Sequence, residues 1–183
     1  MEIWEEIAAD QERGTRRLVA ECGDRLFTAA FFLCRDEGLA EDLVFRTFAS
    51  AVRRIGQYGE KSPFYNWLYA ILLNFYRSDC RKLKAEPLKT GEIPESAVTV
   101  WNEDGEPLAT DEALVVRRAV QSLPPGFREA VVLRYFEDKS LAEMSEIMSV
   151  PLGTVKSRLR LSYERLRRTL KRLLNVENGG LST

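Results

Sequence analysis

Apolar residues recur at helical spacing through most of the chain, and no stretch alternates convincingly as a strand does. In the first half, one apolar stripe runs from Leu18 to Leu33 and a second from Leu43 to Ile55. A third stripe begins just after Pro63, a favoured first-turn residue, and continues to Leu83. The pattern predicts an all-helical bundle with short connections for this half.

The second half contains four further helical stretches. They cover Leu114–Leu123, Phe127–Phe136, Leu141–Met148 and a long segment from Thr154 to about Leu174. Between the halves, breakers interrupt any helical period: Pro87, Gly91, Pro94, Gly105 and Pro107. We therefore expect an all-α protein with two small domains, residues 1–84 and 113–175, joined by an extended linker at 85–112 and followed by a frayed tail at 176–183.

Charge divides along the same boundaries. The 183 residues carry a net charge of −1, but the charge is unevenly distributed. Residues 1–84 hold 13 basic and 13 acidic groups, whereas residues 85–112 hold one basic and eight acidic groups. Residues 113–183 hold 13 basic groups against seven acidic ones. An acidic linker therefore joins a neutral domain to a basic one, for which nucleic acid is the natural partner. By composition alone, the linker could also be a solvated tether.

Several classes of protein are excluded by composition. The chain has no histidine, so histidine-assisted nucleophilic catalysis and His-ligated zinc are excluded. Cys22, Cys34 and Cys80 form no CxxC pair and are expected to be reduced thiols, mostly buried, with no metal site. No paired carboxylates or phosphate-cradling loop suggest an enzyme, a catalytic residue or a cofactor. No membrane-spanning stretch and no signal-peptide pattern are found, so we expect a cytoplasmic protein without membrane insertion.

The segment from Ser140 to Leu159 has helix-turn-helix proportions. A short helix with an apolar inner face is followed by a tight turn and by a second helix, whose inward residues are Val155 and Leu159. Thr154 is placed to cap this second helix. Its other face is expected to present outward the residues Lys156, Ser157, Arg158 and Arg160, which suit phosphate and guanine contacts. An ordinary helical hairpin with a solvated basic face is the alternative.

These motifs resemble known ones. Leu123-Pro-Pro-Gly-Phe-Arg128, Leu133-Arg-Tyr135 and Gly153-Thr-Val-Lys-Ser-Arg158 are similar to region 4 of bacterial sigma factors. Leu39-Ala-Glu-Asp-Leu-Val44 and Pro63-Phe-Tyr-Asn-Trp-Leu-Tyr69 resemble region 2. The order and the short linker are those of the extracytoplasmic-function (ECF) subgroup of the sigma-70 family, with the resemblance spanning roughly Ala9 to Arg172.

The resemblance implies a docking role for one side of the helix around residue 44. In the family, region 2 binds the clamp helices of the largest subunit of RNA polymerase core; the matching residues here are Glu41, Asp42, Val44, Thr47, Phe48 and Ala51. Glu41 and Asp42 near a helix start also favour its dipole, so part of their role is expected to be structural. Phe45-Arg46 stands where the family usually carries Gln-Glu.

Aromatic residues are concentrated between residues 58 and 76, and basic residues follow closely. Such rings can stack unpaired bases, or they can belong to the core, which the apolar stripe favours for Trp67 and Phe75. Tyr65 and Tyr69 lie beside that stripe. The resemblance implies that the loop from Gln57 to Phe64 captures a flipped base at the minus-10 element. The candidate minus-10 and melting residues are Tyr58, Phe64, Tyr65, Trp67, Tyr69, Asn74, Arg77 and Arg81. Ser78 stands where the family often has an acid, and Asp79 follows it.

In region 4, the resemblance places Thr154, Lys156, Ser157, Arg158, Arg160 and Arg165 on the minus-35 element. Leu161-Ser-Tyr163 replaces a commonly basic stretch, and Ser149 stands where a helix-ending glycine is usual. In the family the linker lies in a cationic channel of the polymerase.

The expected function is therefore that of a non-catalytic ECF sigma factor. It would bind polymerase core through the clamp helices and the flap of the second-largest subunit, recognise promoter DNA and nucleate melting, and an anti-sigma factor would be a further partner. The alternative is a stand-alone helix-turn-helix regulator whose N-terminal bundle senses a ligand or dimerises; a protein-binding scaffold or decoy is a third possibility.

Overall fold

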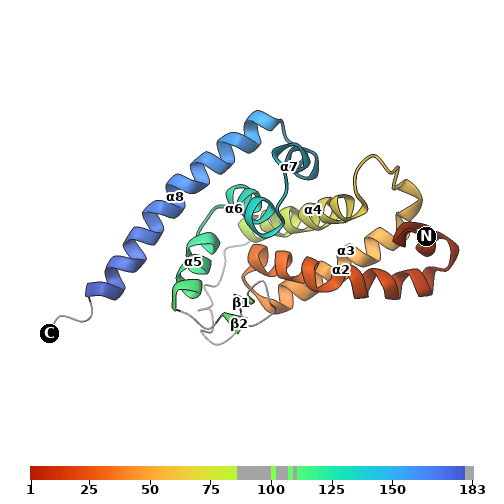
Figure 1. Cartoon of the computed structure of the whole chain (residues 1–183), viewed down its shortest axis with the longest axis horizontal. Helices are drawn as coiled ribbons and strands as arrows, with labels where there is room; N and C mark the ends of the chain where they lie inside the picture. The colour runs from red at the N-terminus through yellow and green to blue at the C-terminus, as the bar shows by residue number, and fades with distance from the viewer. Residues whose placement is uncertain (86–99, 102–106, 109–110, 180–183) are drawn as a thin grey trace.

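The computed structural model describes residues 1–85, 100–101, 107–108 and 111–179 (Figure 1). The first part consists of α1 (Ile3–Ala9), α2 (Gln11–Cys34), α3 (Glu37–Arg53), a 3₁₀ turn (Ile55–Gln57) and α4 (Phe64–Ala85). The second part consists of α5 (Asp111–Gln121), α6 (Pro125–Val131), a π-helical turn (Val132–Phe136), α7 (Leu141–Met148) and α8 (Leu152–Gly179). The prediction of an all-helical protein is confirmed.

The predicted linker lies mostly outside the described residues, as does the end of the predicted tail. Two short strands within the linker are described, β1 (Val100–Trp101) and β2 (Pro107–Leu108), which pair in antiparallel fashion with Val100 opposite Leu108. No strand was predicted there, because two residues are too few to show an alternating pattern.

Helix starts follow from short polar side chains. The Asp10 carboxylate accepts a hydrogen bond from the Arg13 amide at the start of α2 (3.1 Å), and Asp36 accepts one from the Leu39 amide at the start of α3 (2.8 Å). These bonds satisfy amides that have no partner inside the helix. Helix α1 was not predicted, since its seven residues are too few for a periodic signal. A capping box between Glu2 and Glu5 stabilises its first turn.

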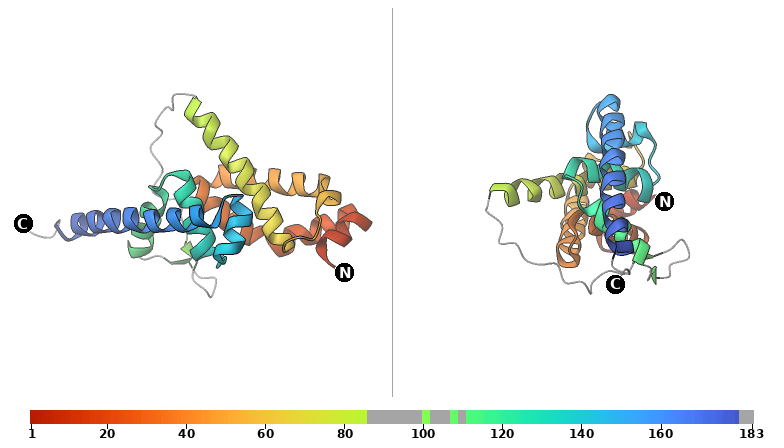
Figure 2. Two further views of the ribbon diagram at one scale, coloured as in Figure 1. Left: turned by 90° about the horizontal axis from the view of Figure 1, so that it is seen from above. Right: turned by 90° about the vertical axis from the view of Figure 1, so that its left-hand side faces the viewer.

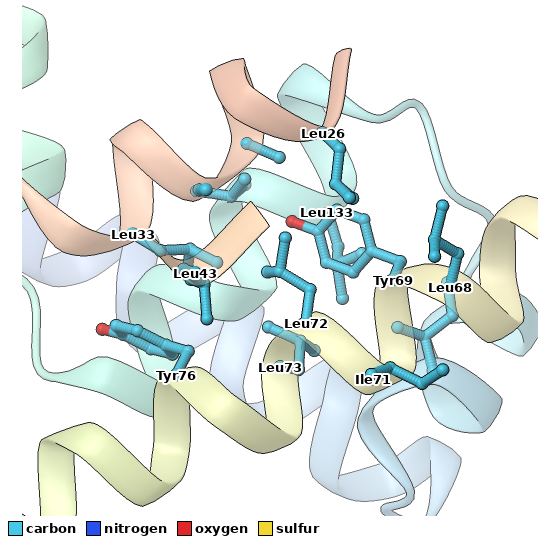
Figure 3. Packing of buried hydrophobic residues seen from close by; sticks show 14 of the residues in the cluster. Leu26, Leu33, Leu43, Leu68, Tyr69, Ile71, Leu72, Leu73, Tyr76 and Leu133 are labelled. Atoms are coloured by element: carbon cyan, nitrogen blue, oxygen red, sulfur yellow. The ribbon is translucent and has the colours of Figure 1, made fainter. Parts of the chain in front are cut away.

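The two parts of the chain share one continuous hydrophobic core. Leu26, Leu33 and Leu43 from α2 and α3 pack with Leu68, Tyr69 and Leu72 from α4. Leu133, from the π-helical turn of the second part, belongs to the same cluster, and Figure 3 shows it beside Tyr69. Met144, Val155 and Leu159 extend the cluster into α7 and α8. The sequence predicted two domains joined by a linker and did not define their relative orientation; in the structure the two parts pack directly against each other.

Helix α4 is central to this packing. In Figure 2 it crosses the other helices of the first part, and it contacts α2, α3, α6 and α7. Its apolar stripe faces the core with Leu68, Ile71, Leu72 and Leu73, all buried. Because α4 packs against both parts, the side chains on its two flanks are held in fixed positions relative to the helix-turn-helix segment.

Candidate nucleic-acid interface

Helix α7, the first helix of the helix-turn-helix segment, begins with a complete capping box. The Ser140 hydroxyl accepts from the Glu143 amide (3.2 Å), and the Glu143 carboxylate accepts from the Ser140 amide (3.0 Å). The bond from the Ser140 amide, with others from the Asn66 side chain and the Ser140 hydroxyl, lowers the pKa of Glu143 to about 2. Met144, Ile147 and Met148 are buried beneath the helix, so α7 has the apolar inner face that the sequence predicted.

The turn after α7 passes through Ser149, which has left-handed backbone angles (φ 53°, ψ 48°). The next residues are held by the Ser145 hydroxyl, which donates to the Val150 carbonyl (2.7 Å). A serine in this conformation is strained, because its Cβ lies close to the backbone. Only glycine adopts it without this cost.

We expect Ser149→Gly to stabilise the protein. Relief of the left-handed strain should raise the free energy of unfolding by about 0.5 to 1 kcal/mol, which for a chain of this size is a melting temperature about 2 °C higher. Differential scanning calorimetry would measure it. Ser157→Gly, at an exposed and right-handed position within α8, is the matched control and should lower the melting temperature. A lower melting temperature for Ser149→Gly would contradict the proposed strain.

Helix α8 begins at Leu152, two residues earlier than predicted. The Pro151 carbonyl accepts the first helical hydrogen bonds, from the Thr154 amide (2.8 Å) and the Val155 amide (3.1 Å). The prediction that Thr154 caps this helix is therefore wrong, since Thr154 already lies in the first turn and is half-buried. Val155 and Leu159 face inward, as predicted.

The basic residues of α8 divide between two faces. Lys156, Ser157 and Arg160 are exposed, and Arg160 pairs with Glu164 (2.6 Å). Arg158 was expected to point outward and does not: its guanidinium lies against Gly126 of α6, and its Nη1 is 3.9 Å from the Glu129 carboxylate. The absence of a side chain at Gly126 leaves the room that Arg158 occupies.

Arg165 lies about one and a half turns after Arg160 along α8. It is exposed, and its guanidinium lies over the Phe127 ring, 5.0 Å from the ring centre. The intervening Leu161-Ser-Tyr163 departs from the family pattern and serves packing. Ser162 is buried and donates to the carbonyls of Arg158 (2.6 Å) and Phe127 (3.2 Å). Tyr163 meets Tyr135 edge to face (5.8 Å between ring centres).

The aromatic residues of α4 lie in two groups. Tyr69 is fully buried in the core, and burial raises its pKa well above the ordinary value. Tyr65 is half-buried; its hydroxyl donates to the Glu137 carboxylate (3.2 Å), and the guanidinium of Arg25 lies over its ring (4.3 Å). In this arrangement, both rings therefore pack within the protein and do not offer a free face to a base. Phe75 is half-buried and packs against the core.

The second group forms an aromatic cluster at the start of α4. Tyr58, Phe64 and Trp67 have ring centres 5.2 to 5.6 Å apart, and all three rings are half-buried. The Tyr58 hydroxyl donates to the Ser62 carbonyl (2.7 Å), which closes the loop before α4. Trp67 packs partly against the core, as predicted, but keeps contact with this loop.

Further along α4, Asn74 and Arg81 are exposed, whereas Arg77 is not free. Its guanidinium makes a two-pronged ion pair with Glu129 of α6, with contacts of 2.7 to 3.2 Å. Glu129 is 1% exposed. The same carboxylate therefore faces one arginine of each predicted DNA-binding set, Arg77 and Arg158.

The Arg46 and Ser78-Asp79 departures from the family pattern are explained together. Arg46 of α3 pairs with Asp79 of α4 (2.5 Å) and with Asp42 (2.7 Å), and its guanidinium lies over the Phe75 ring (5.3 Å). The basic residue on α3 and the displaced acid on α4 thus form one bridge between the two helices.

Helix α3 presents few of its predicted docking residues to solvent. Glu41 and Asp42 are exposed, whereas the other four are buried in the core: Val44, Thr47, Phe48 and Ala51. The exposed face instead carries two apolar side chains that were not in the predicted set, Leu39 (53% exposed) and Phe45 (72% exposed). Leu39, Asp42 and Phe45 recur at i, i+3 spacing and so share one helix face, but the match to the family did not include Leu39 or Phe45.

Further contacts join the two parts of the chain. Arg25 of α2 pairs with Glu137 (2.8 Å), and the side-chain amide of Asn66 donates a hydrogen bond to the Glu143 carboxylate (3.1 Å). Burial raises the pKa of Glu137, although Arg25 opposes that effect. Arg128, 6% exposed, donates to the carbonyls of Leu33, Gln121 and Leu123. None of these partnerships was predicted, because each joins residues far apart in sequence or depends on backbone geometry.

Other candidate chemistry is limited. Among the described residues, no group of three or more histidine, cysteine, aspartate or glutamate side chains is placed to hold a metal. Likewise, no described helix is both long and apolar enough to cross a membrane. Cys22 is buried and Cys34 and Cys80 are half-buried, all as free thiols, and burial raises the pKa of Cys34 to about 12.

Comparison with known proteins assigns both parts of the chain. The family model described as Sigma-70 region 2 matches residues 18–86, and the one described as Sigma-70, region 4 matches residues 113–173. The ECF sigma factor SigW of Bacillus subtilis is 27% identical over 161 residues, covering 82% of this chain and 85% of the relative. The ECF sigma-E factor of Escherichia coli K12 is 30% identical over 134 residues, covering 67% and 69%.

A solved structure agrees in fold. The sigma factor RpoE of Bartonella quintana, in complex with the anti-sigma factor NepR, superposes with a TM-score of 0.68 at 25% identity, covering 85% of this chain and 96% of that one. Region 2 thus precedes region 4 along this chain. The chain belongs to the ECF group of the sigma-70 family, the non-enzymatic subunits that direct RNA polymerase to initiate transcription at particular promoters.

Proposed function

We propose that exposed side chains on the N-terminal half of α8 read the minus-35 element. The observation that supports this most directly is that α8 presents Lys156, Ser157 and Arg160 to solvent. The capped α7 and the tight turn at Ser149 hold α8 in a helix-turn-helix arrangement. Arginine and lysine on such a helix contact guanine edges and phosphates in the major groove. Thr154, Arg158 and Arg165 join this surface in the proposal, Arg158 after leaving Glu129.

The proposal assigns the start of α4 to the minus-10 element. Unstacked bases can stack on the ring faces of half-buried Tyr58, Phe64 and Trp67. Further along α4, the exposed side chains of Asn74 and Arg81 can contact the DNA backbone. Tyr65 and Arg77 contribute only when region 4 moves away, because both now bond to its carboxylates. Tyr69 supports the helix from within the core.

For polymerase docking we propose the exposed face of α3. Glu41, Asp42, Leu39 and Phe45 form a mixed acidic and apolar surface suited to the clamp helices of the largest subunit. The four buried members of the predicted set, Val44, Thr47, Phe48 and Ala51, act by holding α3 in place. The flap of the second-largest subunit is the proposed partner of region 4.

An anti-sigma factor is a further proposed partner, supported by the complex of the related RpoE with NepR. A cytoplasmic location follows from the family, because sigma factors act on RNA polymerase. The compact arrangement described above bonds Tyr65 and Arg77 of region 2 to carboxylates of region 4, so we infer that promoter binding requires regions 2 and 4 to separate.

In vitro transcription with polymerase core over a randomised promoter library tests the function. Specific transcripts should depend on the protein, and a minus-35 sequence should emerge. Arg160→Ala should lower transcription from the selected promoter about 5- to 150-fold, since one good base contact contributes about 1–3 kcal/mol. Core binding, measured by pull-down, should be unchanged.

Two results would contradict this proposal. A footprint by the protein alone, without core, would favour a stand-alone regulator. An equal loss of core binding and transcription in Arg160→Ala would show that α8 does not have a separate DNA-reading role. Arg167→Ala, further along the exposed side of α8, is the matched control and should have a smaller effect that diminishes at high salt.

A further inference from the structure

We propose that Trp4, in helix α1, is a positioning residue for the loop of residues 57–63. The inference rests on the proposed function, in which this loop and the rings beside it hold a base from the opened minus-10 strand. Trp4 itself need not touch DNA in this proposal. It fixes Tyr58, the aromatic residue of the loop, and so sets the place of the whole aromatic cluster.

Helix α1 is held rigidly on α2. Gly14 of α2 lies so close to α1 that a Cβ there would be 2.4 Å from the Ile7 amide nitrogen. Glu6 of α1 is 4% exposed and pairs with two arginines of α2, Arg13 (2.6 Å) and Arg17 (3.0 Å). The Arg17 guanidinium also donates to the Met1 carbonyl (2.8 Å). A seven-residue helix is thereby given a fixed position that it could not keep alone.

From this fixed helix, Trp4 reaches the loop. Its ring meets the Tyr58 ring edge to face, with 5.7 Å between centres. Tyr58 in turn contacts Phe64 (5.2 Å) and Trp67 (5.3 Å), the first turn of α4. The Tyr58 hydroxyl bonds to the Ser62 carbonyl across the loop. Edge-to-face geometry constrains the direction of the ring as well as its distance.

Most residues in and beside the loop are exposed to solvent. Gly56, Gln57, Gly59, Glu60 and Lys61 are exposed, and Glu60 has left-handed backbone angles (φ 55°). A loop of this composition depends on its few ring contacts for a defined shape. Helix α1 precedes residues 18–86, which the region 2 family model matches, so the support that it gives lies outside the matched region.

The test compares Trp4→Ala and Trp4→Phe in the full chain, free and in holoenzyme. In the free protein, hydrogen exchange of residues 57–63 should speed up about fivefold in Trp4→Ala and much less in Trp4→Phe. With holoenzyme, opening of a promoter, followed by 2-aminopurine fluorescence in the minus-10 non-template strand, should slow by a similar factor. Core binding and the minus-35 footprint should be unchanged. Val19→Ala, an exposed change on α2, is the matched control.

Each readout can overturn the proposal. Unchanged loop exchange in Trp4→Ala would show that Trp4 does not hold the loop. Faster exchange with normal opening would show that loop position does not govern melting. If promoter opening and core binding decrease together in Trp4→Ala, or if promoter opening by Trp4→Phe is as slow as by Trp4→Ala, the result would indicate a general loss of folding. If the wild-type holoenzyme fails to open any promoter, the proposed function fails instead, whereas the exchange result on the free chain still stands or falls by itself.

Discussion

Arg128→Met is expected to lower the free energy of unfolding by about 3 kcal/mol. The Arg128 side chain is 6% exposed, and its two terminal nitrogens donate to the carbonyls of Leu33, Gln121 and Leu123 and to the Tyr76 hydroxyl. Methionine fills similar volume but donates nothing, so buried carbonyls from α2 and from the α5–α6 turn lose their partner. Each such buried group costs about 1–3 kcal/mol, and some will be hydrated after rearrangement.

Urea unfolding followed by circular dichroism measures this loss. Because one hydrophobic core runs through both regions, a single transition is expected. Arg128→Lys keeps the charge but lacks the planar guanidinium, so its free energy of unfolding should lie between those of the wild type and Arg128→Met. Arg167→Met on the exposed face of α8 is the matched control, with an expected change within about 0.5 kcal/mol. A loss below about 1 kcal/mol in Arg128→Met would contradict the bridging role assigned to this residue.

Local features of the fold were predictable from the sequence. The bounds of α7 agree with those predicted from Leu141, Met144 and Met148 alone, and α4 begins where Pro63 indicated. These signals are periodic and need only neighbouring residues. The start of α8 was misplaced because a threonine before an apolar run resembles a cap, whereas the Pro151 carbonyl already begins the helix.

The exposure of individual site residues was less predictable. Arg158 was expected to face solvent, but the direction of its side chain is set by Gly126 and Glu129 on another helix. Val44 and Phe48 matched the docking pattern of the family, yet they form part of the core. Sequence spacing fixes which residues share a helix face, but tertiary packing decides which face is covered.

Glu129→Gln is expected to loosen the contact between regions 2 and 4 and to raise DNA binding by the free protein. The carboxylate is 1% exposed and receives Arg77 from region 2 and Arg158 from region 4. Removing a buried partner leaves an uncompensated guanidinium, which favours any arrangement that hydrates it. Since the Arg77 side chain is 25% exposed, the effect is discounted to about 2 kcal/mol, or roughly a thirtyfold shift toward separated regions.

Small-angle X-ray scattering and DNA binding should report this shift together. The radius of gyration should increase, because separation of two packed regions makes the chain less compact. Binding of a minus-35 duplex without core, followed by fluorescence anisotropy, should also tighten, because the substitution removes the carboxylate that attracts Arg158 within region 4. Glu146→Gln makes the same charge change at an exposed position of α7 and should alter neither measurement appreciably. A larger radius without tighter DNA binding would show that Glu129 joins the two regions but does not withhold Arg158 from DNA; an unchanged radius would show that the shared apolar core alone holds them closed.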